Sequence, residues 1–159
     1  RPLFKKHIHA QYRKKILFKE VVRTTRLAYE VLNRMSRYQN DLHQLNNQLL
    51  LQIKLELDSL IAFHEQILKS LSKKAKYNVA QFQYEVDNPQ KKDLMDAFQN
   101  ELIHNPYQTH YSYANIMQII AAIEEYRYHL EHLERLRISF FTYHRSDSDI
   151  DIADEDFDL

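Results

Sequence analysis

Apolar residues recur every three or four positions along three long stretches of this chain, the spacing that places them on one face of a helix. The first helix is expected from about Leu3 to Tyr38, the second up to about Lys74 and the third up to about Tyr143. We expect three apolar stripes to form the core: Phe18, Val21, Val22, Thr25, Ala28, Tyr29, Leu32 and Met35; Leu50, Ile53, Leu57, Leu60, His64, Ile67 and Leu71; and Ile116, Ile119, Ile123, Tyr126, Leu130 and Leu133.

The middle stripe requires a longer window than the other two. Residues 49–57, LLLQIKLEL, alternate apolar and polar positions as a half-buried strand does. Between Leu50 and Leu71, however, the spacing follows heptads, which favours one helix. His64 lies on this seam, where a neutral histidine hydrogen-bonded in the core is expected more often than a ligand or a switch. Burial would lower its pKa, so acid should destabilise the fold.

Polar segments predict where the helices end. The run NDLHQLNN at 40–47 is expected to contain a turn, and NPYQTHYS at 105–112 is expected to be a loop before the last helix. Asn88 and Pro89 form a helix-start signal, because asparagine caps helices and proline suits the first helical position. A short helix is therefore expected to follow and to end near His104.

Together these elements predict an all-α fold, an antiparallel bundle of three long helices plus one or two short ones. Residues 1–145 are expected to form one domain, of which residues 1–19 are a basic amphipathic segment. Residues 146–159, SDSDIDIADEDFDL, form an acidic tail, which we expect to be disordered because it has too little apolar surface to bury.

Composition narrows the chemistry. The chain has no glycine, which argues against phosphate-binding loops, dinucleotide fingerprints and nucleophile elbows, since each of these needs glycine in a tight turn. It has no cysteine, which excludes disulfides, thiolate catalysis and cysteine-bound zinc. No apolar run is long enough to suggest a membrane span. We therefore expect no enzymatic activity and no cofactor.

Charge is distributed unevenly although the formal net charge is +0. Residues 1–40 hold eleven Lys and Arg residues and two acids, whereas residues 146–159 hold seven acids and no base. The basic residues expected to lie near a membrane are Arg1, Lys5, Lys6, Arg13, Lys14, Lys15 and Lys19. Apolar residues lie between them, as in helices that rest on membrane surfaces. The alternative is an ordinary solvated helix face, and no motif for reading nucleic acid accompanies the charge.

Two weaker patterns concern metals. Glu125, His129 and His132 share one helix face and could hold zinc with a fourth ligand. Glu101 and His104 have the Glu-x-x-His spacing found in di-iron bundles, although only one such motif is present. The simpler interpretation of both patterns is a polar helix face with Glu-His and Glu-Arg pairs.

Tyrosines gather near the start of the last helix. Tyr107, Tyr111 and Tyr113 could line a groove for an aromatic or amphipathic ligand. The alternative is that they simply pack in the core with their hydroxyl groups at its rim.

The stretches KEVVRTTRLAYEVLNRMSRYQNDLH and NIMQIIAAIEEYRYHLEHLERL resemble helices in the soluble parts of the fusaric-acid-resistance and aromatic-acid-exporter family. That resemblance implies an accessory or assembly role beside the transmembrane bundle of an efflux protein. Because the chain starts at Arg1 without a methionine, we expect it to be a segment of a longer protein.

The sequence thus predicts a cytoplasmic regulatory or oligomerisation domain of a bacterial inner-membrane transport protein, located at the cytoplasmic face of that membrane. Its expected partners are the membrane-embedded part of the same protein, another protein or a second copy of itself, and not nucleic acid. One alternative is a free-standing helical adaptor that binds a protein. The other is a metal-dependent helical-bundle enzyme that uses Glu101, His104, Glu125, His129 and His132.

Overall fold

The computed structural model describes residues 2–71, 93–104 and 110–143. Its elements are α1 (Pro2–Arg37), α2 (Gln39–His43), α3 (Asn47–Ser70), α4 (Leu94–His104) and α5 (His110–Tyr143). All regular secondary structure in the described ranges is helical, which confirms the predicted fold class. Helix α1 begins and ends within one residue of its predicted limits, and α5 ends at Tyr143 as predicted. Helix α5 starts at His110, however, so the last three residues of the predicted loop at 105–112 are helical.

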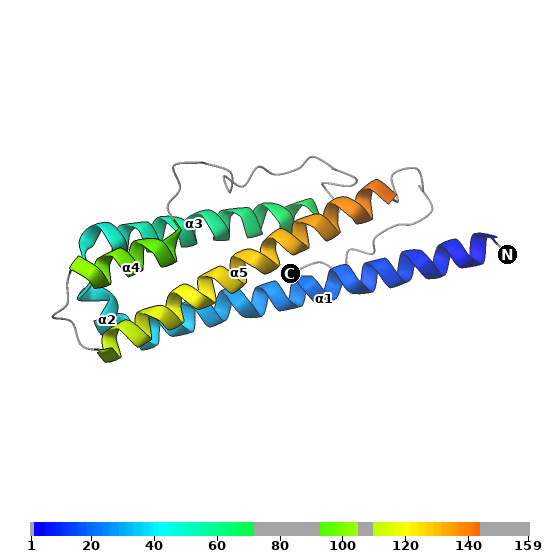
Figure 1. The fold of residues 1–159 in the computed structure, drawn as a ribbon. Coiled ribbons are helices and arrows are strands. Elements are labelled where there is room, and N and C mark those ends of the chain that lie inside the picture. The colour runs from blue at the N-terminus through cyan, green and yellow to red at the C-terminus, as the bar shows by residue number, and fades with distance from the viewer. Residues whose placement is uncertain (1, 72–92, 105–109, 144–159) are drawn as a thin grey trace.

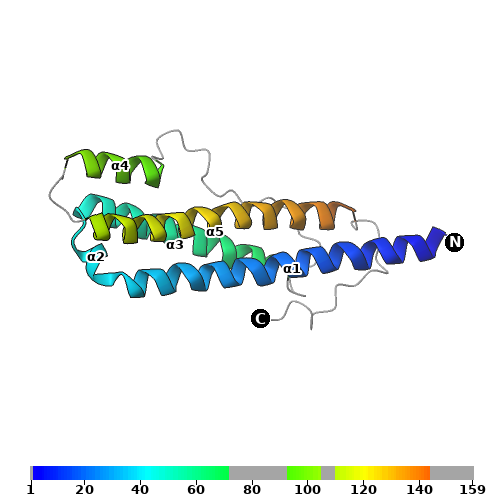
Figure 2. The same ribbon diagram turned by 60° about the horizontal axis from the view of Figure 1, so that its bottom comes forward.

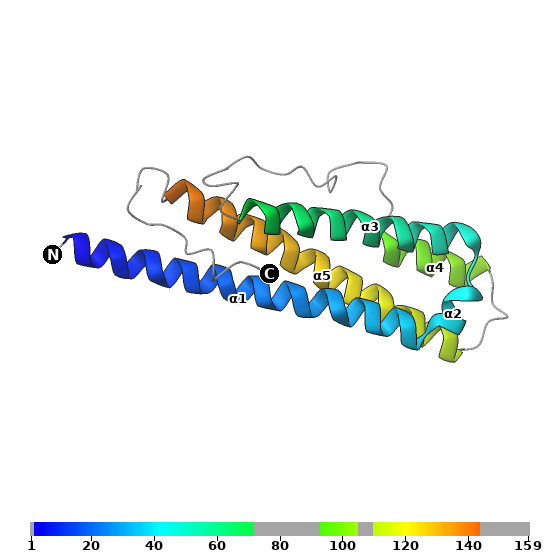
Figure 3. The ribbon, with the colours of Figure 1, turned by 180° about the vertical axis from the view of Figure 1, so that it is seen from behind.

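The helices form an elongated bundle in which α5 lies between α1 and α3 (Figure 1). Viewed from other sides, α1 and α5 still run side by side in opposite directions (Figures 2 and 3). Helix α3 also runs opposite to α1, whereas α3 and α5 point the same way (Figure 1). The short α4 lies beside α3 and runs back towards its start, so that α5 begins at the end of the bundle where α3 begins.

Polar side chains cap the N-termini of α3 and α4. The side chain of Asn46 accepts a hydrogen bond of 2.8 Å from the backbone N–H of Gln48 and so caps α3. The side chain of Asp93 accepts one of 2.8 Å from the N–H of Met95 and caps α4 in the same way. Helix α4 thus begins at Leu94, later than the expected start, and residues 88–89 lie outside the described ranges.

Helix α2 overlaps the predicted break at 40–47 and connects the end of α1 to the start of α3. The carboxylate of Asp41 accepts hydrogen bonds from Ser112 Oγ at 2.9 Å and from Asn115 Nδ2 at 3.0 Å. Since both donors belong to α5, these bonds fix the short helix against the start of α5, while Leu42 is buried beneath it.

The core confirms the predicted stripes of α3 and α5. Every residue of the α5 stripe is buried, and so is every residue of the α3 stripe except the partly buried Leu50. Phe98 of α4 packs into the same apolar cluster. The heptad pattern therefore distinguished helix from strand correctly at residues 49–57.

The predicted stripe of α1 was only partly correct: Val21 is buried, and Ala28 and Met35 are partly buried and pack against the core, but other members are exposed. Tyr29 is 65% exposed and Leu32 47% exposed, and Phe18 is also exposed. The buried positions that the prediction missed include Leu17, Thr24 and Val31. Thr24 can be buried because its hydroxyl donates to the carbonyl oxygens of Glu20 and Val21 within the same helix, each at 3.0 Å. Helix α1 thus carries two apolar stripes, and only one of them faces the bundle.

No helix in the described ranges is long and apolar enough to cross a membrane. The predicted acidic tail at 146–159 lies outside the described residues.

Candidate membrane-proximal surface

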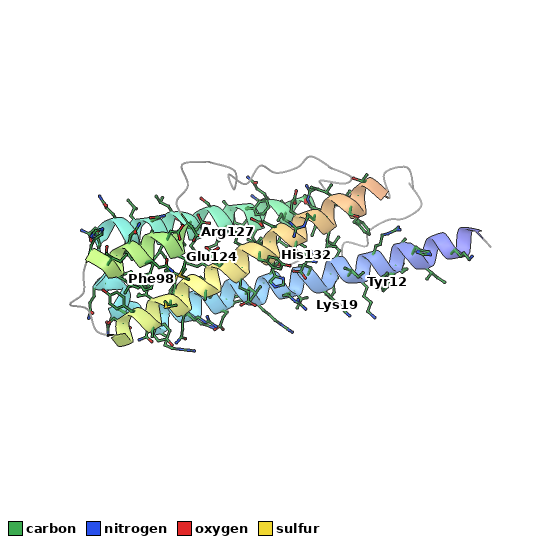
Figure 4. All side chains as sticks on the ribbon, viewed as in Figure 1. Tyr12, Lys19, Phe98, Glu124, Arg127 and His132 are labelled. Atoms are coloured by element: carbon green, nitrogen blue, oxygen red, sulfur yellow. The ribbon has the colours of Figure 1, made fainter. Side chains whose placement is uncertain are left out.

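The outward side of the first half of α1 combines positive charge with apolar side chains. Lys5, Ile8, Tyr12, Lys15 and Lys19 follow one another at steps of three and four residues, so they share one face of the helix, and all five are exposed. We call these five residues the basic α1 face. Tyr12 is 64% exposed, although aromatic side chains of this size are usually largely covered. Figure 4 labels Tyr12 and Lys19 on this helix.

The other side of the same segment packs on the bundle. Ala10 and Leu17 are almost completely buried. The first half of α1 is therefore held by its inner side, and the basic α1 face is presented on a fixed helix.

The only acid in residues 1–29 does not neutralise this face, because it is buried. That acid is Glu20, whose Oε1 lies 2.7 Å from His129 Nδ1 on α5. Two further bases, Arg23 and Arg26, are exposed on the next turns of α1. The exposed charge on α1 from Lys5 to Arg26 is consequently all positive.

A hollow of about 420 Å³ adjoins the basic α1 face. Its described lining is Gln11, Tyr12, Lys14, Lys15 and Phe18. The hollow has more apolar than polar surface, yet it is bordered by two lysine stems. Such a surface suits a ligand with an apolar group next to negative charge.

Not every predicted basic residue belongs to this face. Arg1 lies outside the described residues, as does the side chain of Lys6. Arg13 and Lys14 are only partly exposed, and both have other interactions. Lys5, Lys15 and Lys19 are the predicted residues that the structure brings together with exposed apolar side chains.

The predicted metal ligands are not assembled. Within the described ranges, no three His, Asp or Glu side chains are close enough to hold a metal ion. The ring of His129 is instead bonded to Glu20 across the α1–α5 interface, and Glu125 is exposed. On α4, His104 is exposed and Glu101 partly buried, and they do not meet the residues of α5 as ligands.

His64 lies in the core, as its heptad position predicts, with 7% of its surface exposed. Its Nδ1 shares a hydrogen bond of 2.6 Å with the hydroxyl oxygen of Tyr126 on α5, and the two rings meet edge to face with centroids 5.6 Å apart. Burial lowers the pKa of His64 to about 4. Burial, together with the negative charge of Glu65, raises the pKa of Tyr126. The imidazole is therefore neutral at neutral pH and joins α3 to α5.

A charged contact, which sequence reasoning missed, also joins α3 to α5. The Nε and Nη2 of Arg127 donate to Oε1 of the buried Glu56, the former at 2.9 Å, and Arg127 Nη1 donates to Glu124 Oε2 at 2.8 Å. Figure 4 labels Glu124 and Arg127 on α5. On the same helix, the fully buried Arg137 forms two bonds of 2.8 and 2.7 Å with Glu134. These buried charges are paired, as stability requires.

The predicted tyrosine groove is described only at one residue. Tyr113 is buried and meets Phe98 of α4 edge to face, with ring centroids 5.7 Å apart. Figure 4 labels Phe98 on α4. Tyr107 lies outside the described residues, and so does the side chain of Tyr111. At Tyr113, packing between α4 and α5 accounts for the side chain.

Comparison with known proteins gives one informative similarity. The chain is 31% identical over 156 residues to the UPF0421 protein YgaE of Bacillus subtilis (strain 168). The match covers 95% of this chain but only 42% of that relative. This chain thus spans less than half the length of the relative. No family model and no solved structure matches the chain.

Proposed function

We propose that this chain is the cytoplasmic regulatory or oligomerisation domain of an efflux-type transport protein of a bacterial inner membrane. In this role, the basic α1 face rests against the membrane surface or the membrane-embedded part of the same protein. The domain performs no catalysis and binds no cofactor; it transmits or stabilises the arrangement of the membrane part through its rigid bundle.

The basic α1 face is the observation that carries this proposal. Three lysines lie on one helix side with the exposed Ile8 and Tyr12, and Glu20, the acid nearest in sequence, is buried. Basic side chains are attracted to anionic lipid head groups, and apolar or aromatic side chains between them enter the interfacial layer. An excess of Lys and Arg next to membrane spans is typical of the cytoplasmic side.

Two further observations support a domain within a larger membrane protein. Residues matching nearly the whole of this chain form less than half of YgaE, so in that protein such a segment is joined to a longer chain. The resemblance of two helical stretches to the aromatic-acid-exporter family points in the same direction. Under this proposal the transported compound is recognised by the membrane part and not by this domain.

Vesicle binding tests the membrane contact. We expect the chain to sediment with vesicles that contain phosphatidylglycerol and not with vesicles of phosphatidylcholine alone. Each basic side chain near an anionic surface contributes about 1 kcal/mol, so Lys15→Glu combined with Lys19→Glu should weaken binding at least about 30-fold.

The matched control reverses two exposed basic residues outside this face, Lys54→Glu on α3 and Arg37→Glu at the end of α1. Its binding should change less than about threefold, since neither residue contacts the surface in this orientation. Equal weakening by both double variants, or equal binding to both kinds of vesicle, would refute the proposed membrane contact. The reading frame provides a separate test: hydrophobic spans encoded ahead of Arg1 would support the proposal, and a start codon directly before it would refute it.

A second candidate function, a free-standing adaptor that binds a protein, is favoured by one observation. Exposed apolar side chains also occur on the second half of α1, at Tyr29 and Leu32. If these two residues contact a protein or a second copy, Tyr29→Ser with Leu32→Ser should abolish that association in sedimentation velocity and leave vesicle binding unchanged. If they weaken vesicle binding as strongly as the lysine variants, the membrane contact extends along the whole helix and the adaptor proposal fails.

A further inference from the structure

The basic α1 face has a complementary segment within the same chain. We propose that the acidic segment 146–159 docks on the basic α1 face and covers it when no membrane is bound. The contact itself is independent of the function proposed above; only its regulatory consequence rests on that function.

Charge is the first argument. Segment 146–159 contains seven Asp and Glu residues and no Lys or Arg. On α1, Lys5, Lys15 and Lys19 are exposed, with Arg23 and Arg26 beyond them, and no exposed acid lies among these residues. A purely acidic segment and a purely basic helix side attract each other strongly at low salt.

The apolar residues of the two partners also match. Ile150, Ile152 and Phe157 lie between the acids of the segment, and Leu159 follows the last acid. On α1, Ile8 and Tyr12 are exposed between the lysines, and the hollow of about 420 Å³ lies beside Tyr12 and Lys15. The segment therefore carries apolar side chains flanked by negative charge, and α1 carries exposed apolar side chains flanked by positive charge. This pattern distinguishes the proposed contact from general electrostatic attraction.

The register of α1 and α5 brings the segment within reach. Glu20 contacts His129, and Arg34 Nη1 donates to the carbonyl oxygen of Gln118 at 2.8 Å. Since the two helices are antiparallel, continuing this register places Tyr143 level with about residue 6 of α1. The end of α5 and the start of α1 indeed lie at the same end of the bundle (Figure 1).

From Tyr143, the remaining sixteen residues span up to about 53 Å when extended, at about 3.3 Å per residue. The part of α1 from Lys5 to Arg26 is about 32 Å long, at 1.5 Å per residue. The segment can therefore leave α5 and follow the whole basic side of α1 without a change in the bundle.

The consequence for the proposed function is competition for one surface. Anionic lipid and the acidic segment would bind the same lysines, so each displaces the other. Docking of the segment thus sets a threshold of negative surface charge below which the domain does not engage the membrane.

Because the chain has no cysteine, a single nitroxide can be placed on the segment through Ser148→Cys. In the absence of lipid, and at about 0.01 M salt, we expect the spin label to broaden the backbone amide signals of residues 8–26. The amides of α3 between Leu51 and Ala62 serve as the internal control and should stay sharp. At about 1 M salt, where the screening length falls from about 30 Å to about 3 Å, the broadening should fall several-fold.

Variants and mixing complete the test. Lys15→Glu with Lys19→Glu should remove the broadening, and Lys54→Glu with Arg37→Glu should leave it unchanged. Spectra of either variant with dispersed, native-like signals also show that the bundle is still folded. In a mixture of isotope-labelled chain and unlabelled spin-labelled chain, the broadening should vanish, because the contact is within one molecule. Absence of broadening on α1, equal broadening on α3, or persistence in the mixture would overturn the proposal.

The same proteins separate the two proposals. Replacing the seven acids of the segment by Asn and Gln should strengthen binding to phosphatidylglycerol vesicles about tenfold. If neither the wild type nor the variant without the seven acids binds vesicles, but the broadening is present, the membrane contact fails and the docking stands. If vesicles are bound but no broadening occurs, the docking fails and the membrane contact stands.

Discussion

Acid should destabilise this bundle through His64. Its pKa is 6.5 in an exposed state and about 4 in the fold, so the unfolded chain takes up a proton at a higher pH than the native one does. The stability held by the neutral imidazole is complete above pH 6.5 and is lost as the pH falls from there towards 4. From these two pKa values, the free energy of unfolding should drop by about 1 kcal/mol at pH 5.5 and by about 2 to 3 kcal/mol at pH 4.5.

Urea unfolding followed by circular dichroism at several pH values between 7.5 and 4.5 measures this effect. Other groups titrate in the same range, so the informative quantity is the difference between the wild type and His64→Leu. The leucine continues the seam between Leu60 and Ile67 and removes the proton site. His104→Gln removes an exposed imidazole on α4 and serves as the matched control. Parallel stability curves for the wild type and His64→Leu would refute the reasoning.

Three further predictions concern stability measured by urea unfolding at pH 7.5. Glu56→Ala leaves a partly buried arginine without one of its partners and should cost about 3 kcal/mol, whereas Glu30→Ala breaks a partly exposed pair within α1 and should cost under about 0.5 kcal/mol. Asn46→Ala removes the cap of α3 and should cost about 1 kcal/mol, and Asn46→Asp should retain most of it. Ile53→Ala creates a cavity in the core and should cost about 3 kcal/mol, while the exposed Leu55→Ala should change stability by under about 0.5 kcal/mol; equal effects of the two would contradict the described packing.

The heptad seam of α3 could be predicted because only one side of this helix carries a continuous apolar row. His64 belongs to that row and is buried, as its position predicts. Helix α1 could not be oriented in the same way. It has apolar residues on two sides, and the sequence does not show which side α5 covers. From the sequence, Leu32 is a better candidate for burial than Thr24, yet Thr24 is buried and Leu32 is exposed. The hydrogen bond that lets the Thr24 hydroxyl be buried forms only once the helix has formed.

The candidate surface was predictable in part for a related reason. Excess positive charge near the start of the chain is visible in the sequence, but which lysines share the exposed side follows only from the orientation of α1. The pairing of Glu56 with Arg127 joins residues 71 positions apart, and neither residue alone carries a signal of burial. The metal-like pattern on α5 could not be interpreted from one helix alone, because the sequence does not show that His129 faces Glu20 on another helix.

The pairing of the first and last long helices constrains the order in which the bundle can form during synthesis. Glu20 and His129 are 109 positions apart, so α1 has left the ribosome long before its partner does. At about 5 to 20 residues per second, the inner side of α1 remains uncovered for about 5 to 20 s. During that interval Leu17, Val21 and Val31 are available to chaperones and to other nascent chains. Final closure of the bundle thus waits until α5 has been synthesised, and a ribosome that stalls before α5 leaves behind a fragment prone to aggregation.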